Sequence, residues 1–162
     1  MVNFSNYLYE NLMIDRELKV LLVSPINKWS SLLKVDCNFD NFEVKAYSNA
    51  DFKEEDNDCD LIICKNSEKY SKETLDKLTS FGLSSSLTTQ KRVTIGYIFD
   101  DTSSTKSNYD ILYITSFKGY IETTDRMFLD KEKNMVEVCA QVLMIHDDLE
   151  RQKTKKIGRK ID

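Results

Sequence analysis

Glycine and histidine are scarce in this chain. Its 162 residues include four glycines, one proline and one histidine. The glycines stand alone, so the sequence has no glycine-rich loop that could hold the phosphates of a dinucleotide or of ATP. A single histidine, His146, excludes an HExxH zinc motif and argues against a histidine-centred triad. We therefore expect no cofactor, and a noncatalytic protein is favoured over an enzyme.

Long hydrophobic runs are also missing. The longest apolar runs, 20–23, Leu61–Cys64 and 142–145, are far shorter than the roughly 20 residues that a membrane-spanning helix needs. Residues 1–14 lack the basic start and the apolar stretch of a secretory signal. Four cysteines without such a signal are typical of reduced thiols, so a cytoplasmic location without a transmembrane segment is predicted.

The hydrophobic pattern predicts one α+β domain over residues 1–150. Short apolar or alternating runs are typical of strands, and apolar residues spaced three or four apart are typical of helices. Strands are predicted at 18–24, Phe42–Tyr47, Leu61–Cys64, Val93–Phe99, 111–117 and 120–123. Helices are predicted at 4–14, 25–33, 71–81 and 135–149.

Local signals refine this outline. Ser71 is the expected N-cap of its helix and Gly82 the left-handed residue that ends it, which makes 83–91 a loop. The polar segment 100–108 predicts a β-hairpin between its two flanking strands. We expect a mixed or mainly antiparallel sheet with packed helices and a long C-terminal helix. A three-layer α/β domain of flavodoxin type is the alternative.

Charge is divided unevenly along the chain. The net charge is −4, from 23 basic and 27 acidic residues. Residues 151–162 carry about +5 and the rest about −9. The basic residues of this tail are Arg151, Lys153, Lys155, Lys156, Arg159 and Lys160. A flexible solubilising tail is the first interpretation. Contact with nucleic acid or an anionic membrane is an alternative that we do not favour, and contact with the acidic body is a third.

Few residues are candidates for chemistry. Asp100 and Asp101 follow a predicted strand and are the only metal candidates, because paired carboxylates can hold Mg²⁺ beside substrate phosphates; a solvated turn is favoured. Cys59 and Cys64 lack zinc-ligand spacing and are expected to be core thiols. The acidic stretch 51–60 is expected to be a solvated loop, or secondly a patch for a basic partner.

The predicted last helix carries an apolar stripe. Its members include Val138, Val142, Ile145 and Leu149. Packing of this stripe on the sheet is the first interpretation. A homodimer interface is the second, because two subunits can share such a stripe, and it makes these four residues the candidate interface.

The order of predicted elements resembles two families. Helix 4–14, three strands, helix 71–81, the meander 93–123 and the final helix are similar in order to the small dimeric chaperones of type III secretion. That resemblance implies a noncatalytic dimer that holds a client segment, although residues 24–42 would be an insertion.

The strand spacing also resembles receiver domains, with Lys118 after the last strand at the place of the receiver lysine. The acidic pair of that family is replaced by Ser24-Pro25-Ile26, and Lys65-Asn66 stand where its phosphoacceptor would be. This resemblance implies a degenerate receiver that cannot be phosphorylated. From the whole sequence we expect a protein-interaction module, an adaptor or a chaperone-like dimer. A degenerate receiver and an accessory factor that contacts nucleic acid through the tail are the alternatives.

Overall fold

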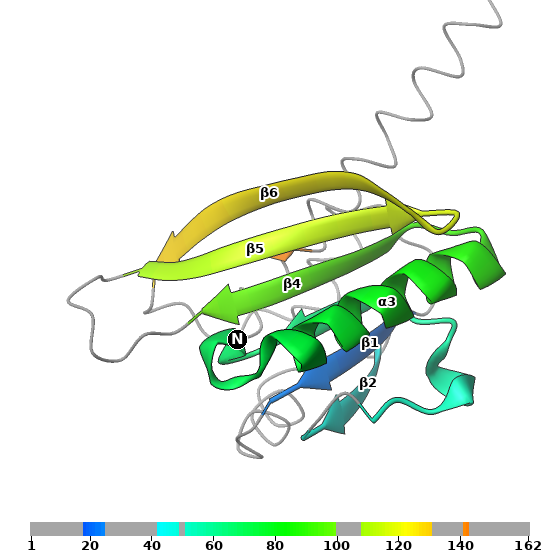
Figure 1. The fold of residues 1–162 in the computed structure, drawn as a ribbon, viewed down its shortest axis with the longest axis horizontal. Helices are drawn as coiled ribbons and strands as arrows, with labels where there is room; N and C mark the ends of the chain where they lie inside the picture. The colour runs from blue at the N-terminus through cyan, green and yellow to red at the C-terminus, as the bar shows by residue number, and fades with distance from the viewer. Residues whose placement is uncertain (1–17, 25–41, 49–50, 100–107, 131–140, 143–162) are drawn as a thin grey trace, which may run out of the picture.

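The computed structural model describes residues 18–24, 42–48, 51–99, 108–130 and 141–142 (Figure 1). Six strands form one mixed sheet in the order β2-β1-β3-β4-β5-β6. The strands are β1 (Leu18–Val23), β2 (Phe42–Tyr47), β3 (Leu61–Cys64), β4 (Val93–Phe99), β5 (Asn108–Phe117) and β6 (Tyr120–Asp130). With the helix α3 (Lys72–Thr89), this sheet gives the chain an α+β fold.

The sheet has a parallel half and an antiparallel half, which meet at β4. β2, β1, β3 and β4 run parallel to one another, whereas β5 is antiparallel to β4 and β6 is antiparallel to β5. The hairpin predicted between β4 and β5 is therefore confirmed. The sheet departs from the five parallel strands of a receiver domain at its fifth strand.

The compact apolar runs were predicted well. β3 is buried at all four positions and β4 at six of its seven, as expected of strands covered on both faces. β5 starts three residues earlier than predicted, at Asn108. β6 departs further from the prediction, because it continues to Asp130 instead of stopping at residue 123.

Gly82 does not end the helix, and the loop predicted at 83–91 is wrong. Ser71 is the N-cap as predicted, since its hydroxyl accepts a hydrogen bond from the Thr74 N–H at 3.2 Å. The helix passes through Gly82 and ends before Gln90, which has a φ of 55°. A Cβ at position 82 would lie 2.5 Å from Cδ1 of Ile95. The glycine therefore serves close packing of α3 on β4, and that packing extends the helix.

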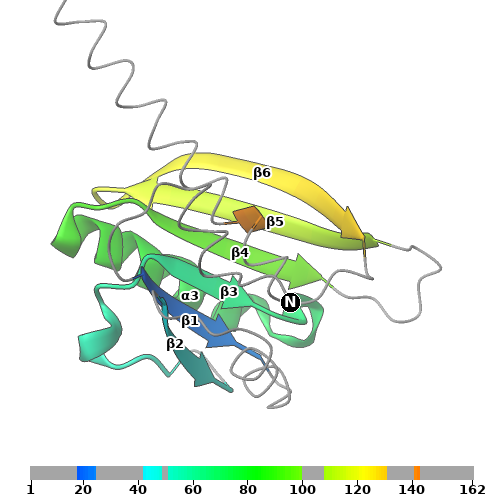
Figure 2. The same cartoon turned by 180° about the vertical axis from the view of Figure 1, so that it is seen from behind.

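Side chains from α3 cover one face of the sheet, called here the α3 face. Leu78 of the helix packs there with Ile62, Ile95 and Ile114 in the main buried cluster. Gln141 and Val142, which are helical, lie over the opposite face (Figure 2). A Cβ on Gly96 would lie 3.5 Å from Cγ2 of Val142. Both faces of the central strands thus contribute to the core.

Several predicted segments lie outside the described residues. They include the helices at 4–14 and 25–33, and all of the helix at 135–149 except Gln141 and Val142. Val142 is fully buried within its own chain, which fits packing of its segment on the sheet. The other candidate interface residues of that stripe, Val138, Ile145 and Leu149, are not among the described residues. Within the described part of the chain, no helix has the length and apolar character needed to span a bilayer.

Candidate functional site

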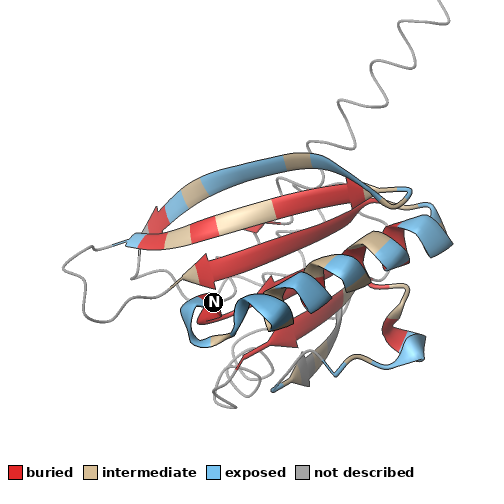
Figure 3. Ribbon diagram, viewed as in Figure 1, coloured by how far each residue is buried: buried red, intermediate tan, exposed pale blue. Residues whose placement is uncertain are grey.

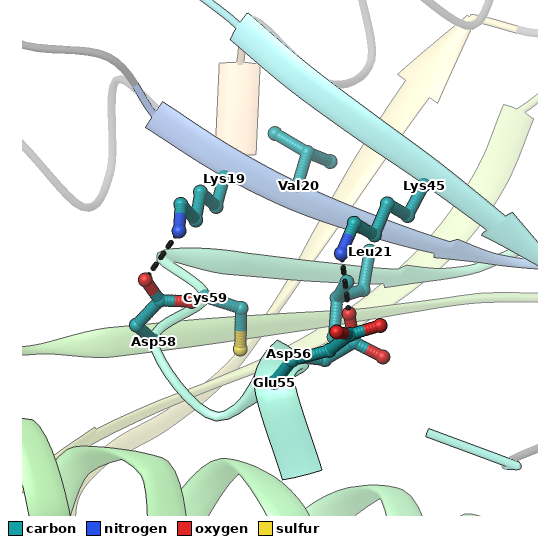
Figure 4. A pocket seen from close by; sticks show the side chains of 8 residues that line it. All are labelled: Lys19, Val20, Leu21, Lys45, Glu55, Asp56, Asp58 and Cys59. Atoms are coloured by element: carbon teal, nitrogen blue, oxygen red, sulfur yellow. Dashed lines mark hydrogen bonds and ion pairs between the residues drawn. The ribbon is translucent and has the colours of Figure 1, made fainter. Parts of the chain in front are cut away.

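A small hollow lies between the start of β1 and the acidic segment before β3 (Figure 4). Lys19 forms an ion pair with Asp58 across it, and Nζ of Lys45 lies 3.1 Å from Oδ1 of Asp56. The enclosed space is about 10 Å³, close to the volume that one water molecule requires. The hollow is therefore too small for a substrate.

Asp56 is the best-bonded carboxylate at this hollow. It accepts hydrogen bonds from the Tyr47 hydroxyl, from the Lys53 N–H at 2.9 Å and from Lys45. Burial alone would raise the pKa of Asp56, but these three donors outweigh burial and hold the pKa below its ordinary value. The pKa of Tyr47 is raised to about 12 by burial and by the Asp56 carboxylate. Both groups keep their ordinary charge at neutral pH.

The expectation of a solvated acidic loop at 51–60 is partly wrong. Asp51, Glu54 and Glu55 are exposed, but Asp56 and Asp60 are only 2% and 1% exposed. Asp60 accepts a hydrogen bond from the Lys19 N–H at 2.9 Å and lies 3.1 Å from Nζ of Lys91. These contacts fasten the segment to β1 and to the start of β4, so the two buried carboxylates have a structural role.

The described cysteines are core thiols, as predicted. Cys59 and Cys64 are free and fully buried, and burial raises the pKa of each thiol to about 11. At neutral pH both therefore remain protonated and unreactive. Among the described residues, no three His, Cys, Asp or Glu side chains are placed to hold a metal ion. The metal candidates Asp100 and Asp101, His146 and the basic tail lie outside those residues.

The two lysines singled out by the receiver resemblance lie at opposite ends of the sheet. Lys65 follows β3 at the carboxyl end of the parallel strands, where it is fully buried with Nζ 4.1 Å from the centroid of the Tyr109 ring. Lys118 is exposed in the turn between β5 and β6. Because β5 is antiparallel to β4, that turn lies beside the start of the parallel strands. The structure does not bring these two lysines together.

The outer strand β6 is the most exposed element of the sheet (Figure 3). It is an edge strand of 11 residues, and no described strand pairs with its outer side. The described residues have four exposed large hydrophobic side chains: Leu87, Tyr120, Ile121 and Phe128, with exposed fractions of 61%, 76%, 50% and 63%. Three of them belong to β6. Long exposed edges that carry apolar side chains are sites where another strand can pair.

A β-bulge divides β6 near its start. Thr123 pairs with Thr115, but Ile121 pairs with Ser116, so Glu122 is an extra residue. The Ser116 hydroxyl lies 3.5 Å from the Gly82 carbonyl of α3, which puts Ser116 and its partner Ile121 on the α3 face. Thr124, Arg126 and Phe128 share that face, since they pair with Ile114, Leu112 and Asp110.

Two ion pairs hold β6 in place, one to Arg92 just before β4 and one to Asp110 of the neighbouring strand β5. Glu122 pairs with Arg92, which is 3% exposed, and Nη1 of Arg126 lies 2.8 Å from Oδ2 of Asp110. At the turn, the Gly119 N–H donates to the Ser86 hydroxyl of α3 at 3.0 Å. The apolar side chains of β6 are therefore presented on a well-anchored edge, which sequence reasoning missed because it ended the strand at residue 123.

Comparison with known proteins gives no match: no family model, curated protein or solved structure matches the chain. The likeness to type III secretion chaperones and the likeness to receiver domains therefore stay predictions.

Proposed function

We propose that this chain is a noncatalytic protein-interaction module that binds through the outer edge of β6. One observation carries the proposal: three of the four exposed large hydrophobic side chains in the described part of the chain lie on this single edge strand. Pairing of a strand with an exposed sheet edge supplies main-chain hydrogen bonds, and the apolar side chains add contact area.

The polar groups of the described residues support the same assignment. At the hollow, Lys19 is paired with Asp58 and Lys45 with Asp56, and the two buried thiols are protonated at neutral pH. The hollow that these ion pairs line encloses only about 10 Å³, whereas catalytic groups usually gather at a cleft large enough for a small molecule. An interaction surface accounts for the exposed features better than a reaction centre does.

The proposal is tested by affinity capture from the source cell with wild-type protein and with an Ile121→Lys/Phe128→Lys variant. Both side chains are exposed, so the variant is expected to fold normally while the added charge opposes burial at the edge. A protein captured by the wild type is purified and its binding is measured by calorimetry. We expect the variant to bind at least about tenfold more weakly, a loss of about 1.4 kcal/mol.

Ser80→Lys is the matched control, because Ser80 is exposed on α3 away from β6. It introduces one lysine at a site away from the edge, against two lysines in the double variant, and is expected to bind like the wild type. Equal binding by all three proteins would show that the edge of β6 is not the binding surface.

A further inference from the structure

The exposed apolar side chains around β6 fall into two groups. Tyr120 and Ile121 stand at the start of the strand, and Leu87 of α3 lies beside the preceding Gly119, since a Cβ on Gly119 would lie 3.2 Å from Cβ of Leu87. Phe128 stands near the other end of the strand. A partner that covers both groups must present apolar contacts at two separated points.

We propose that the occupant of this edge is a second copy of the chain, paired with it antiparallel through β6. The inference rests on the proposed function and names its partner. Antiparallel pairing about a two-fold axis places the start of each strand beside the end of the other, so each apolar group of one copy meets the complementary group of the second. The two six-stranded sheets then form one continuous sheet.

The two-fold axis restricts the register. Directly opposite residues in an antiparallel pair lie on the same face of the sheet, whereas neighbouring residues of one strand lie on opposite faces. A two-fold axis perpendicular to the sheet leaves each face on its own side. The axis must therefore pass beside one residue, which pairs with its own copy, and not between two neighbouring residues. Centres at Asp125 or Arg126 would set two like-charged side chains directly opposite each other, with Cβ atoms about 4.5–5.5 Å apart, which is destabilising. A centre at Thr124 sets threonine against threonine and Asp125 against Thr123 of the second copy.

The bulge at Glu122 completes this register. Because Glu122 is extra, Ile121 rather than Glu122 comes opposite Arg126 of the second copy. Both belong to the α3 face, where the aliphatic stem of Arg126 can cover Ile121 while its guanidinium keeps Asp110 as partner. Tyr120 comes opposite Met127 on the other face. The pairing therefore requires neither the Arg126–Asp110 nor the Arg92–Glu122 ion pair to break.

The same register gives the exposed Leu87 a contact with Phe128 of the second copy. In the register centred on Thr124, Phe128 of one copy lies opposite Gly119 of the other, on the α3 face. Gly119 has no side chain to cover, and Leu87 is the side chain beside it. Phe128 would thus rest against Leu87 and Ile121 of the second copy. All four exposed large hydrophobic residues acquire contacts from one interface.

Disulfide trapping tests both the partner and the register. Thr124→Cys places two thiols across the two-fold axis at a separation that a disulfide spans, whereas Asp125→Cys places them off the axis. Under mild oxidation we expect Thr124→Cys to give a covalent dimer about tenfold faster than Asp125→Cys. Wild-type protein measures the background from the four native cysteines. Adding Ile121→Lys and Phe128→Lys to Thr124→Cys is expected to abolish the trapping, and adding Ser80→Lys is expected to leave it unchanged.

Light scattering on the wild type provides an independent readout. We expect a dimer that dissociates on dilution, with the Ile121→Lys/Phe128→Lys variant remaining a folded monomer. A wild-type monomer at about 100 μM, where a dimer of micromolar affinity is populated, would overturn the second copy as partner. Faster trapping of Asp125→Cys than of Thr124→Cys would overturn the register. A monomer that still captures another protein through β6 would leave the proposed function standing, whereas loss of all β6-dependent binding would remove both.

Discussion

Substitution of Gly82 by alanine has two opposing effects on stability: a more favourable helix residue and a steric clash with β4. Gly82 lies inside α3, where alanine is more favourable than glycine by about 1 kcal/mol. The added methyl would lie 2.5 Å from Cδ1 and 3.2 Å from Cγ1 of Ile95. Ile95 is 1% exposed and cannot move aside freely, because it is packed among other buried side chains.

The packing penalty is expected to exceed the gain in helix preference. Overpacking of a well-filled core costs about 1–3 kcal/mol, so Gly82→Ala should lower the free energy of unfolding by about 1 kcal/mol. Ile95→Val removes the Cδ1 atom and alone costs about 0.5–1.5 kcal/mol. In the Ile95→Val background the methyl of alanine enters the vacated space, and Gly82→Ala should then be stabilising.

The assay is a double-mutant cycle measured by urea unfolding at one protein concentration. We expect a coupling free energy of at least about 1 kcal/mol, with Gly82→Ala changing sign between the two backgrounds. Unchanged m-values would show that the compactness of the unfolded state is not responsible. An effect of Gly82→Ala that is the same in both backgrounds, or stabilisation by Gly82→Ala alone, would refute the close contact between α3 and β4.

Two further predictions concern buried polar groups. Asp56→Asn should lower the free energy of unfolding by about 2–3 kcal/mol, since Asp56 accepts charge-assisted hydrogen bonds. Because the pKa of Asp56 in the folded protein is held below the ordinary 3.8, its contribution to stability is full above that pH and is lost as the pH falls through the pKa of the folded state. Urea unfolding at neutral and acidic pH should therefore show that the wild type loses more free energy of unfolding on acidification than Asp56→Asn does. Identical losses for the two proteins would contradict this role. In a Cys37→Ser/Cys139→Ser variant, which keeps only the two buried cysteines, Cys59 and Cys64 should react with Ellman's reagent only after denaturation. Both are fully buried, and burial raises the pKa of each thiol to about 11. Rapid labelling of the folded protein would show that the core is open.

The central strands were predictable because their signal is local. Runs such as Leu61–Cys64 and Val93–Phe99 are apolar enough to be buried on both faces, and the structure places them at the middle of the sheet. The end of α3 was mispredicted because glycine after a periodic helix usually marks its end. Contact with Ile95 comes from a strand that the local pattern around Gly82 does not reveal.

The candidate surface was harder to predict for two physical reasons. The bulge at Glu122 reverses the faces of the residues before it, which breaks the alternation that marks a strand. An edge position also depends on strand order, and strand order is a property of the whole sheet. The burial of Asp56 and Asp60 is equally nonlocal, since their lysine partners Lys45 and Lys91 come from β2 and from the turn that precedes β4.

The change of strand direction at β4 has a consequence for how the chain folds. β4, β5 and β6 are joined by hairpins, whose sequence-local pairing can close rapidly, whereas the parallel pairs join segments that are far apart in the chain. We expect the meander to nucleate and to offer the free side of β4 as a template for β3. During synthesis from the amino end, β1 and β3 emerge before that template exists. Their apolar side chains therefore remain exposed to solvent until β4 to β6 have been synthesised, and we expect the nascent chain to be most prone to aggregation during this interval.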